Sequence, residues 1–471
     1  MMLRRAFLGF VYALFLGWLA IPALNALRTT DFLTDNAVLT QAALLIIIPA
    51  VMLLHSVVSN RHSLAWSMFW VWSLIFLGLA STYQISRGQF PWRGTLAVTD
   101  IVEAQQLILI AHAVTIAFYF LTAARSKPQE VIQVEAKWDG RHFKRAVIST
   151  MVIHVFVVAM FAALMGSSMF AGRATFQSML LARAGTPGFG SMYFISNAGA
   201  IIIPAMAIIL RKRGMNLPIP LIGLSVAASF LATNPFIGSR FLTGSFLVAV
   251  VGALLTANQR RGLPGGMILA FVTIFPTLDL LRGDGTGATQ LAISDPADTL
   301  TDFDYDAFEM LTREVSVNGN LPAGLPSTGD LLIAPFFRWI PFLARGVEGH
   351  ASGPVVAQST HMTYTNVSMP LWAEAHLIGA LPGVIIAFAV LGVLLARTRS
   401  TGHSVFGILI ELPMAALLFI VLRGSLYEVL GYLLLACALA WAFARAERKD
   451  RLEEAESAGP VHVPAGSLRV E

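Results

Sequence analysis

Charged residues are scarce in this sequence. Asp, Glu, Lys and Arg make up only 13% of its 471 residues, and 56% are hydrophobic, with a mean hydropathy of +0.70. Soluble domains carry about 25% charged residues. This composition excludes an ordinary soluble enzyme and an intrinsically disordered chain.

Several chemical signatures are also lacking. The single cysteine, Cys437, lies in an apolar stretch, which excludes an internal disulfide and a cysteine zinc cluster. The sequence has no phosphate-binding loop, no dinucleotide-binding glycine fingerprint and no HExxH motif. We therefore predict no cofactor, no metal and no use of ATP or NAD.

Long apolar runs separated by short basic loops are what the chain does have, and they are typical of a polytopic helical membrane protein. The predicted fold class is all-α, because a helix needs about 20 apolar residues to cross a bilayer. We predict twelve transmembrane helices, at residues 6–26, 37–58, 64–84, 101–124, 146–167, 191–210, 217–234, 240–257, 264–281, 370–396, 404–422 and 426–444. The first follows Arg4-Arg5 and is too long for a signal peptide, so it is interpreted as a signal anchor.

The basic residues favour one orientation in the membrane. They cluster in every second loop, as at Lys144-Arg145, Arg211–Arg213 and Arg260-Arg261, and they recur in the tail from Arg445. Because cytoplasmic loops are enriched in Lys and Arg, both termini are predicted to be cytoplasmic. The expected location is the inner (plasma) membrane, with membrane lipids around the protein and no role for nucleic acid.

The loop at 282–368 is much longer than the others. It divides the chain into helices 1–9 (1–281), the extracytoplasmic loop (282–368), helices 10–12 (369–445) and a disordered cytoplasmic tail (446–471). The loop is acidic at first, and 304–315 has the pattern of a short amphipathic helix. Asp302, Asp304 and Asp306 alternate as in a cation site, but no glycine or glutamate follows at calcium-loop spacing. They are interpreted as solvated acids at a helix start.

Ionisable residues gather at the predicted outer ends of the helices, and such residues are costly within a membrane unless they serve a site. Arginine suits phosphate because its planar fork of donors matches phosphate oxygens. The candidate substrate-binding residues are Arg240, Arg282, Arg338, Arg345 and Arg423. Glu374 is the preferred general base, because a partly desolvated carboxylate can accept a proton near neutral pH, and His376 and His361 are its rivals.

The order of these motifs resembles the O-antigen polymerase (Wzy) class, the oligosaccharide repeat-unit polymerases. The likeness covers roughly 230–430. It consists of a Gly-Ser-Arg before a late helix, a large outer loop with an Arg-Trp segment, and Trp372-Ala373-Glu374 leading into a glycine-rich helix, then Arg423-Gly424. The sequence departs from the family where Phe337, instead of proline, precedes Arg338.

The resemblance implies a polysaccharide polymerase of the cell envelope. Such a glycosyltransferase moves a growing glycan from polyprenyl pyrophosphate to the next lipid-linked repeat unit, with a flippase and a chain-length regulator as expected partners. Two alternatives remain. An O-antigen ligase-like transferase shares the same features and differs in its acceptor. A lipid-linked glycan flippase or other transporter usually has repeated halves and midplane polar groups, and neither is visible here.

Overall fold

The computed structural model contains helices and no strand in the part that it describes. The residues described are 2–28, 36–59, 63–92, 94–125, 138–234, 238–256, 259–274, 296–317, 327–338, 351–362, 364, 367–400 and 404–457. Within them the all-α prediction is confirmed.

Among the described residues, eight helices are long and apolar enough to cross a membrane by length and composition, as a membrane protein requires. One of them is continuous through three segments, α3 (Leu64–Trp72), the π-helix η1 (Ser73–Leu79) and α4 (Ala80–Arg87). The others are α1 (Met2–Arg28), α2 (Asn36–Val58), α5 (Val98–Arg125), α6 (Arg141–Met165), α8 (Phe189–Lys212), α17 (Leu371–Ser400) and α19 (Leu426–Ser457). These eight correspond to eight of the twelve predicted spans.

The other four predicted spans are shorter helices in the structure. They are α9 (Ile219–Ala232), α10 (Arg240–Leu254), α18 (Val405–Val421) and the pair α11 (Leu263–Leu269) and η4 (Ala270–Ile274), which follows the turn η3 (Gln259–Gly262). Residues 275–281 of the ninth predicted span lie outside the described residues. Twelve full-length spans are therefore more than the described helices show.

Helix ends that the sequence assigns to the same side of the membrane do meet in space. The Lys212 ammonium donates to the carbonyl of Leu254 at 2.8 Å, which joins the ends of α8 and α10. At the start of α3, Ser63 contacts Thr398 near the end of α17. At the other end of the molecule, the amide of Leu371 donates to the carbonyl of Leu422. The alternation of the helices is thus consistent with the alternation of the basic loops.

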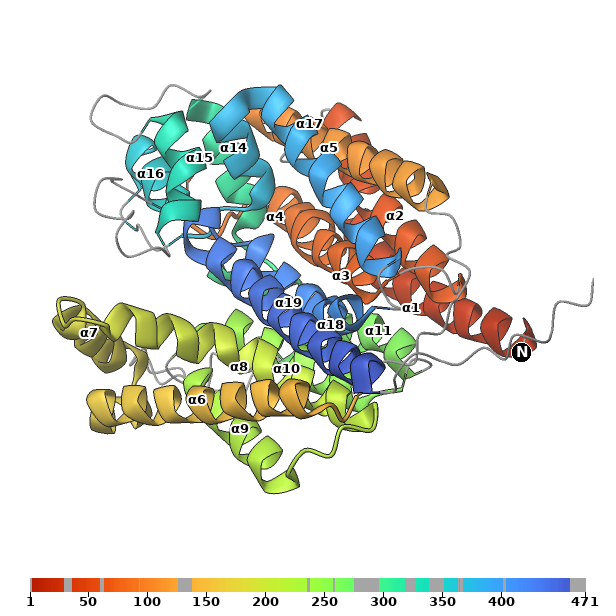
Figure 1. Ribbon diagram of the computed structural model, residues 1–471. Coiled ribbons are helices and arrows are strands. Elements are labelled where there is room, and N and C mark those ends of the chain that lie inside the picture. The colour runs from red at the N-terminus through yellow and green to blue at the C-terminus, as the bar shows by residue number, and fades with distance from the viewer. Residues whose placement is uncertain are drawn as a thin grey trace, which may run out of the picture.

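The long axes of the helices run between these two ends in Figure 1, with the N-terminus at one end. Short helices lie at the opposite end in Figure 1: α7 (Arg173–Arg183), α14 (Ala307–Val317), α15 (Thr328–Phe337) and α16 (Ser352–Ser359). The short elements α13 (Pro296–Thr299) and η5 (Phe303–Tyr305) precede α14 in the chain. The turn η2 (Gly166–Phe170) leads into α7. We call this the acidic end, because it contains Asp304 and Asp306, and α14 confirms the helix predicted at 304–315.

The segment from α3 to α4 is enclosed by the rest of the protein. The apolar stretch of this segment is completely buried, whereas only 22% of the corresponding apolar stretches of α1 and α17 is buried. Trp72 stacks on Trp372 of α17 with ring centroids 5.1 Å apart. The close approach continues at Gly78, where an added Cβ would lie 2.7 Å from the carbonyl oxygen of Leu45. The core therefore forms around α3, and the outer helices offer apolar faces to lipid.

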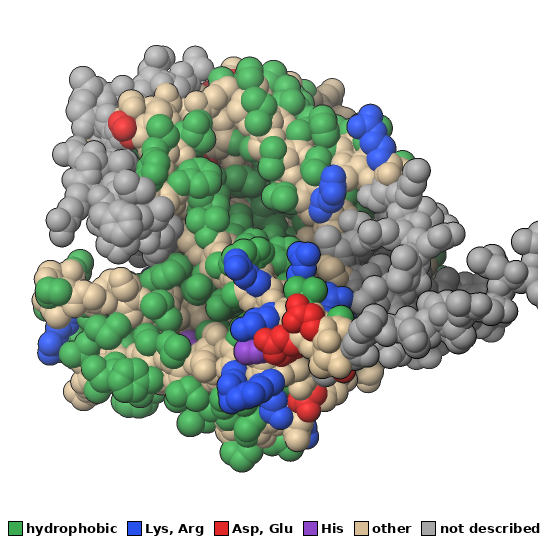
Figure 2. All heavy atoms as spheres, in the orientation of Figure 1, with side chains coloured by type: hydrophobic (Ala, Val, Ile, Leu, Met, Phe, Trp, Pro, Cys, Tyr) green, Lys and Arg blue, Asp and Glu red, His purple; other side chains and the backbone are tan. Residues whose placement is uncertain are grey.

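The end of the molecule opposite the acidic end, where α6 begins and α19 ends, is called the basic end. There, α19 is longer than predicted. It continues to Ser457, past the boundary near 446 where a disordered tail was expected, so that boundary is wrong. Asp450 accepts hydrogen bonds from the amides of His142 and Phe143 at 2.9 and 2.8 Å and so caps the start of α6. Lys449 and Glu453 add an i,i+4 ion pair. Figure 2 shows Lys and Arg side chains gathered over this part of α19 and the start of α6.

Candidate functional site

The acidic segment before α14 is buried, which corrects the interpretation of these residues as solvated acids. Only Asp302 behaves as expected, because it is exposed and its side chain accepts from the amide of Phe303. Tyr305 and Asp306 are fully enclosed, and Asp304 is 17% exposed. The hydroxyl of Tyr305 donates to the carbonyl of Phe271 at 2.7 Å. Burial of carboxylates requires paired partners, and each of these two acids has them.

Two arginines that are far apart in the sequence meet on these acids. Arg240 forms an ion pair with Asp304, and Arg423 lies 4.0 Å from Asp304 and 3.4 Å from Asp306. Arg240 is the first residue of α10, where the positive end of the helix dipole disfavours a cation. The carboxylate of Asp304 compensates for that cost. The structure thus brings together two of the five arginines selected from the sequence.

Asp306 connects four parts of the chain. It accepts from the Trp92 indole nitrogen at 3.0 Å and from the amide of Ser368 at 3.1 Å, and the Ser368 hydroxyl also donates to it. Together with Arg423, these donors engage both of its oxygens. Asp306 therefore fixes the segments before α5 and α17 against the turn between α18 and α19.

Arg423 keeps one donor free within this cluster. Its guanidinium carbon lies 4.2 Å from the ring centroid of Phe241, and its Nε has no hydrogen-bond partner among the described residues. Burial lowers the pKa of Arg423, and the nearby Asp306 opposes that shift. A buried N–H without a partner is costly, so this donor is suited to an acceptor on a ligand.

Glu374 is almost completely enclosed and its acceptor capacity is used. Its Oε1 accepts from the hydroxyls of Ser352 and Ser425 at 2.8 and 3.0 Å, and its Oε2 accepts from the amide of Leu426 at 2.7 Å. Leu426 is the first residue of α19, so the carboxylate lies at a helix start, where a negative charge is favoured. Glu374 joins the starts of α16, α17 and α19, which is the geometry of a structural cap.

His376 is held by a carboxylate that sequence reasoning did not select. Its Nδ1 lies 3.0 and 2.8 Å from the two oxygens of Glu314, a fully buried residue of α14. Burial raises the pKa of Glu314, and its contacts with His376 oppose that effect. When Nδ1–H donates to Glu314, the lone pair for accepting a proton is on Nε2. Of the three candidate bases, His376 has this oriented arrangement.

The structure describes two of the four remaining candidates. Arg338 ends α15, where it donates to the carbonyl of Tyr427 at 3.1 Å and stacks over the Tyr427 ring. His361 is exposed in the turn after α16 and has a positive φ of 54°. Arg282 and Arg345 lie outside the described residues.

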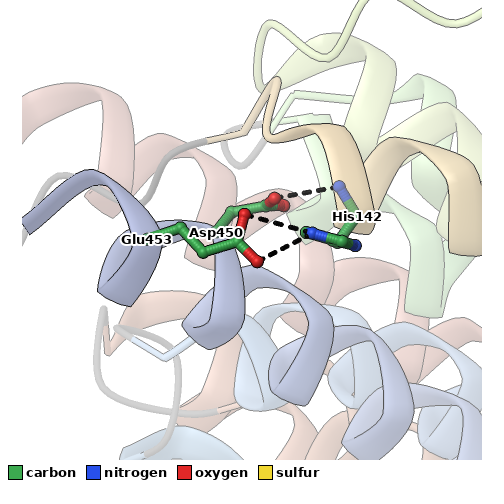
Figure 3. A group of neighbouring side chains, drawn as sticks. All are labelled: His142, Asp450 and Glu453. Atoms are coloured by element: carbon green, nitrogen blue, oxygen red, sulfur yellow. Dashed lines mark hydrogen bonds and ion pairs between the residues drawn. The ribbon is translucent and has the colours of Figure 1, made fainter. Parts of the chain in front are cut away.

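One group of possible metal ligands occurs among the described residues, and it lies at the basic end. Figure 3 shows His142 of α6 facing Asp450 and Glu453 of α19. The Asp450 carboxylate already caps α6, and the His142 Nε2 lies 3.0 Å from Glu453. The α6 start and Lys449 add positive potential, which disfavours a cation. We interpret this group as a connection between two helices.

Sequence reasoning did not select Asp304 and Asp306 as partners of the arginines, nor Glu314 as the partner of His376. One signal was available: α14 carries acids at 309 and 314 among apolar residues, and a buried helix with acids requires partners. Their partners could not be identified from spacing, because Arg240, Arg423 and His376 come from three different segments.

The comparisons with known proteins add no relative. No protein-family model, no curated protein and no solved structure matches this chain.

Proposed function

We propose that this protein is a membrane glycosyltransferase that polymerises polyprenyl-pyrophosphate-linked oligosaccharide units on the extracytoplasmic face of the plasma membrane. The observation that carries the proposal is the Arg240–Asp304–Arg423 cluster with its unpartnered Arg423 Nε. Two guanidinium groups at one end of a membrane helix bundle suit a pyrophosphate at the membrane surface.

The acids beside these arginines have a defined role in this proposal. Asp304 and Asp306 hold the two guanidinium groups close together in the free protein, where their mutual repulsion would otherwise separate them. Each guanidinium has five N–H donors, and the two carboxylates do not engage all of those on Arg423. Pyrophosphate oxygens then bind the donors that remain.

The transfer step breaks the bond between the anomeric carbon of the donor sugar and its phosphate oxygen. A new bond forms between that carbon and the hydroxyl oxygen of the acceptor sugar. The acceptor proton moves to His376 Nε2, which Glu314 orients through Nδ1. The pyrophosphate leaves with the bonding electrons, and Arg240 and Arg423 stabilise its negative charge. The driving force comes from the sugar–pyrophosphate bond, so no nucleotide is consumed.

The test uses Arg240→Lys, Arg423→Lys and His376→Gln in cells that lack the native protein. Each lysine keeps the charge and loses the planar fork of donors. We therefore expect the rate of polymerisation to fall about 10- to 150-fold, which corresponds to about 1.5–3 kcal/mol. The readout is accumulation of single lipid-linked repeat units at normal protein level. Arg87→Ala is the matched control, because Arg87 pairs with the exposed Asp298 at the same end.

Full-length polymer from the Arg423→Lys strain would overturn the proposal, and so would an equal defect in Arg87→Ala. The same assay separates polymerase from ligase: unpolymerised repeat units indicate a lost polymerase, and complete polymer left on its lipid carrier indicates a lost ligase. Orientation is tested by replacing Cys437 and labelling single cysteines from outside. We expect labelling at 298 and none at 453.

A further inference from the structure

Three aromatic side chains form an exposed group at the acidic end. The ring centroid of Trp92 lies 4.8 Å from that of Phe303 and 5.5 Å from that of Tyr364. Phe303 and Tyr364 are 47% and 59% exposed. The three come from separate segments, before α5, in η5 and after α16, and none belongs to a long apolar helix. These rings therefore lie outside the helices that would contact the lipid core.

Trp92 is rigidly held, although its neighbours are exposed. Its indole N–H donates to Asp306 at 3.0 Å, and its backbone amide donates to Glu309 at 2.8 Å. A ring fixed at both its backbone and its side chain loses little conformational entropy on binding a ligand. We call Trp92, Phe303 and Tyr364 the aromatic trio.

A polar pocket of about 350 Å³ lies beside the trio, between the starts and ends of α5, α14 and α16. Its polar lining comes from Thr95, Asp100, Arg313, Ser316, Ser359 and Thr360. The hydroxyls of Ser316, Ser359 and Thr360 donate to carbonyls within their own helices, so their oxygens remain available as acceptors. Its volume is at the small end of the range for small-molecule sites, about 300–1,000 Å³.

The trio and the pocket form one surface. Glu309 accepts from Trp92 through one oxygen and from Arg313 through the other, at 2.8 Å in each case. Gly94 lies close to Arg313, because an added Cβ on Gly94 would be 3.1 Å from the Arg313 Nη2. Glu309 thus holds Trp92 of the aromatic trio and Arg313 of the polar pocket in a fixed relative position.

We propose that this surface binds a saccharide, with a sugar ring on the aromatic trio and a neighbouring sugar in the pocket. A sugar ring has a flat C–H face that packs on an aromatic ring, and a rim of hydroxyls that donate to carboxylate and hydroxyl oxygens. The Arg313 charge is compensated by Glu309, and Asp100 adds a negative charge. A pyrophosphate is disfavoured here and a neutral glycan is favoured.

This inference rests on the proposed function, because it assigns the glycan portion of the same lipid-linked substrate. It also makes a separate claim, since saccharide binding by the surface needs no transfer reaction. Trp92 and Asp306 connect the two sites directly, because Asp306 contacts both the Trp92 indole and Arg423. Glycan seated on the trio is therefore beside the residues proposed to hold pyrophosphate.

The test measures binding to the full-length protein in lipid nanodiscs by saturation-transfer NMR and calorimetry. The probes are neutral oligosaccharides and the lipid-free repeat unit released from the cells' lipid-linked pool by mild acid. We expect Tyr364→Ala to weaken binding about 3- to 10-fold, as loss of one aromatic contact implies. Asp100→Asn should weaken it similarly. The control Phe170→Ala removes another exposed aromatic ring, 79% exposed, and should leave binding unchanged.

Saccharide binding that is absent, or equally strong in wild type and in the double variant Tyr364→Ala/Asp100→Asn, overturns the inference. Association of the trio with anionic lipid vesicles in place of saccharide also overturns it. The two proposals fail in different ways. Normal polymer from Arg423→Lys with intact saccharide binding rejects the proposed transfer only, and blocked polymer without saccharide binding rejects the surface only.

Discussion

The two ends of the helix bundle use charge in different ways. At the acidic end, Asp306 and Glu314 are fully buried and join segments that are far apart in the sequence. At the basic end, His142 and Glu453 are one-third and one-half exposed. Exposed pairs contribute about 0–1 kcal/mol, whereas an unpaired buried charge costs several. The acidic end is therefore the region where a single substitution affects both stability and chemistry.

The largest expected effect comes from Asp306→Ala. Removal of this carboxylate leaves Arg423, the Trp92 indole and the Ser368 amide without their acceptor. We expect the free energy of unfolding to fall by about 3–5 kcal/mol, which is a large fraction of the stability of a typical protein. Thermal unfolding followed by size-exclusion chromatography in detergent measures it. A cost no greater than that of Asp450→Ala would remove the contrast between the two ends.

A smaller loss is expected for Glu374→Gln. The amide retains the shape of the carboxylate but loses its charge, and its NH₂ group faces donors where an acceptor is needed. We expect the free energy of unfolding to fall by about 1.5–3 kcal/mol, which is the range for hydrogen bonds to charged groups. The transferase activity per folded molecule distinguishes the two roles of Glu374. Activity is retained if Glu374 is a structural cap and lost if it is the general base. A folded Glu374→Gln protein with no activity would restore Glu374 as the base.

Asp450→Ala tests the basic end. Its carboxylate caps α6 through two amides, so we expect a loss of about 0.5–2 kcal/mol, the range for helix N-caps. Asp450→Asn is the matched control, because asparagine caps nearly as well as aspartate. Unfolding temperatures of the two variants give the comparison. If Asp450→Ala lowers the free energy of unfolding more than Asp306→Ala does, the basic end contributes more to stability than the acidic end.

The smallest expected effect is a change in the pH dependence of protein stability when Glu309 is replaced by glutamine. Burial raises the pKa of Glu309, although Trp92 and Arg313 oppose the shift. The folded protein then binds more protons than the unfolded chain, so stability falls as pH rises from the ordinary carboxyl range through the raised pKa. Glu309→Gln removes this titration, and its unfolding temperature should vary less with pH across that window. If the unfolding temperature of Glu309→Gln varies with pH as steeply as that of the wild type, another group causes the pH dependence.

The basic end was the easier region to predict from sequence. Its features are local: apolar runs give the helices, and basic loops at alternate positions show which helix ends lie together. The extension of α19 was missed, because Lys449 and Glu453 read as a charged tail until their i,i+4 spacing is combined with the Asp450 cap.

The acidic end was predicted only in part. Arg240 and Arg423 could be selected, because they lie at the predicted outer ends of apolar helices, where basic residues are less frequent than at the cytoplasmic ends. Asp304 could not be assigned to them, because alternating acids before a helix also fit a solvated start. The pairing of Glu314 with His376 depends on how α14 packs against α17, and no periodicity in either segment encodes it.

The enclosed segment from α3 to α4 has a consequence for biosynthesis. It is made early, but Trp372 and Thr398, which cover it, belong to α17 near the end of the chain. Before α17 is inserted, Trp66 and Trp70 can already pack on Tyr119 and His112 of α5, but Trp72 lacks its stacking partner Trp372. Chains truncated before α17 should therefore leave the Trp72 side of α3 accessible and be degraded, even though every helix up to that point has been inserted.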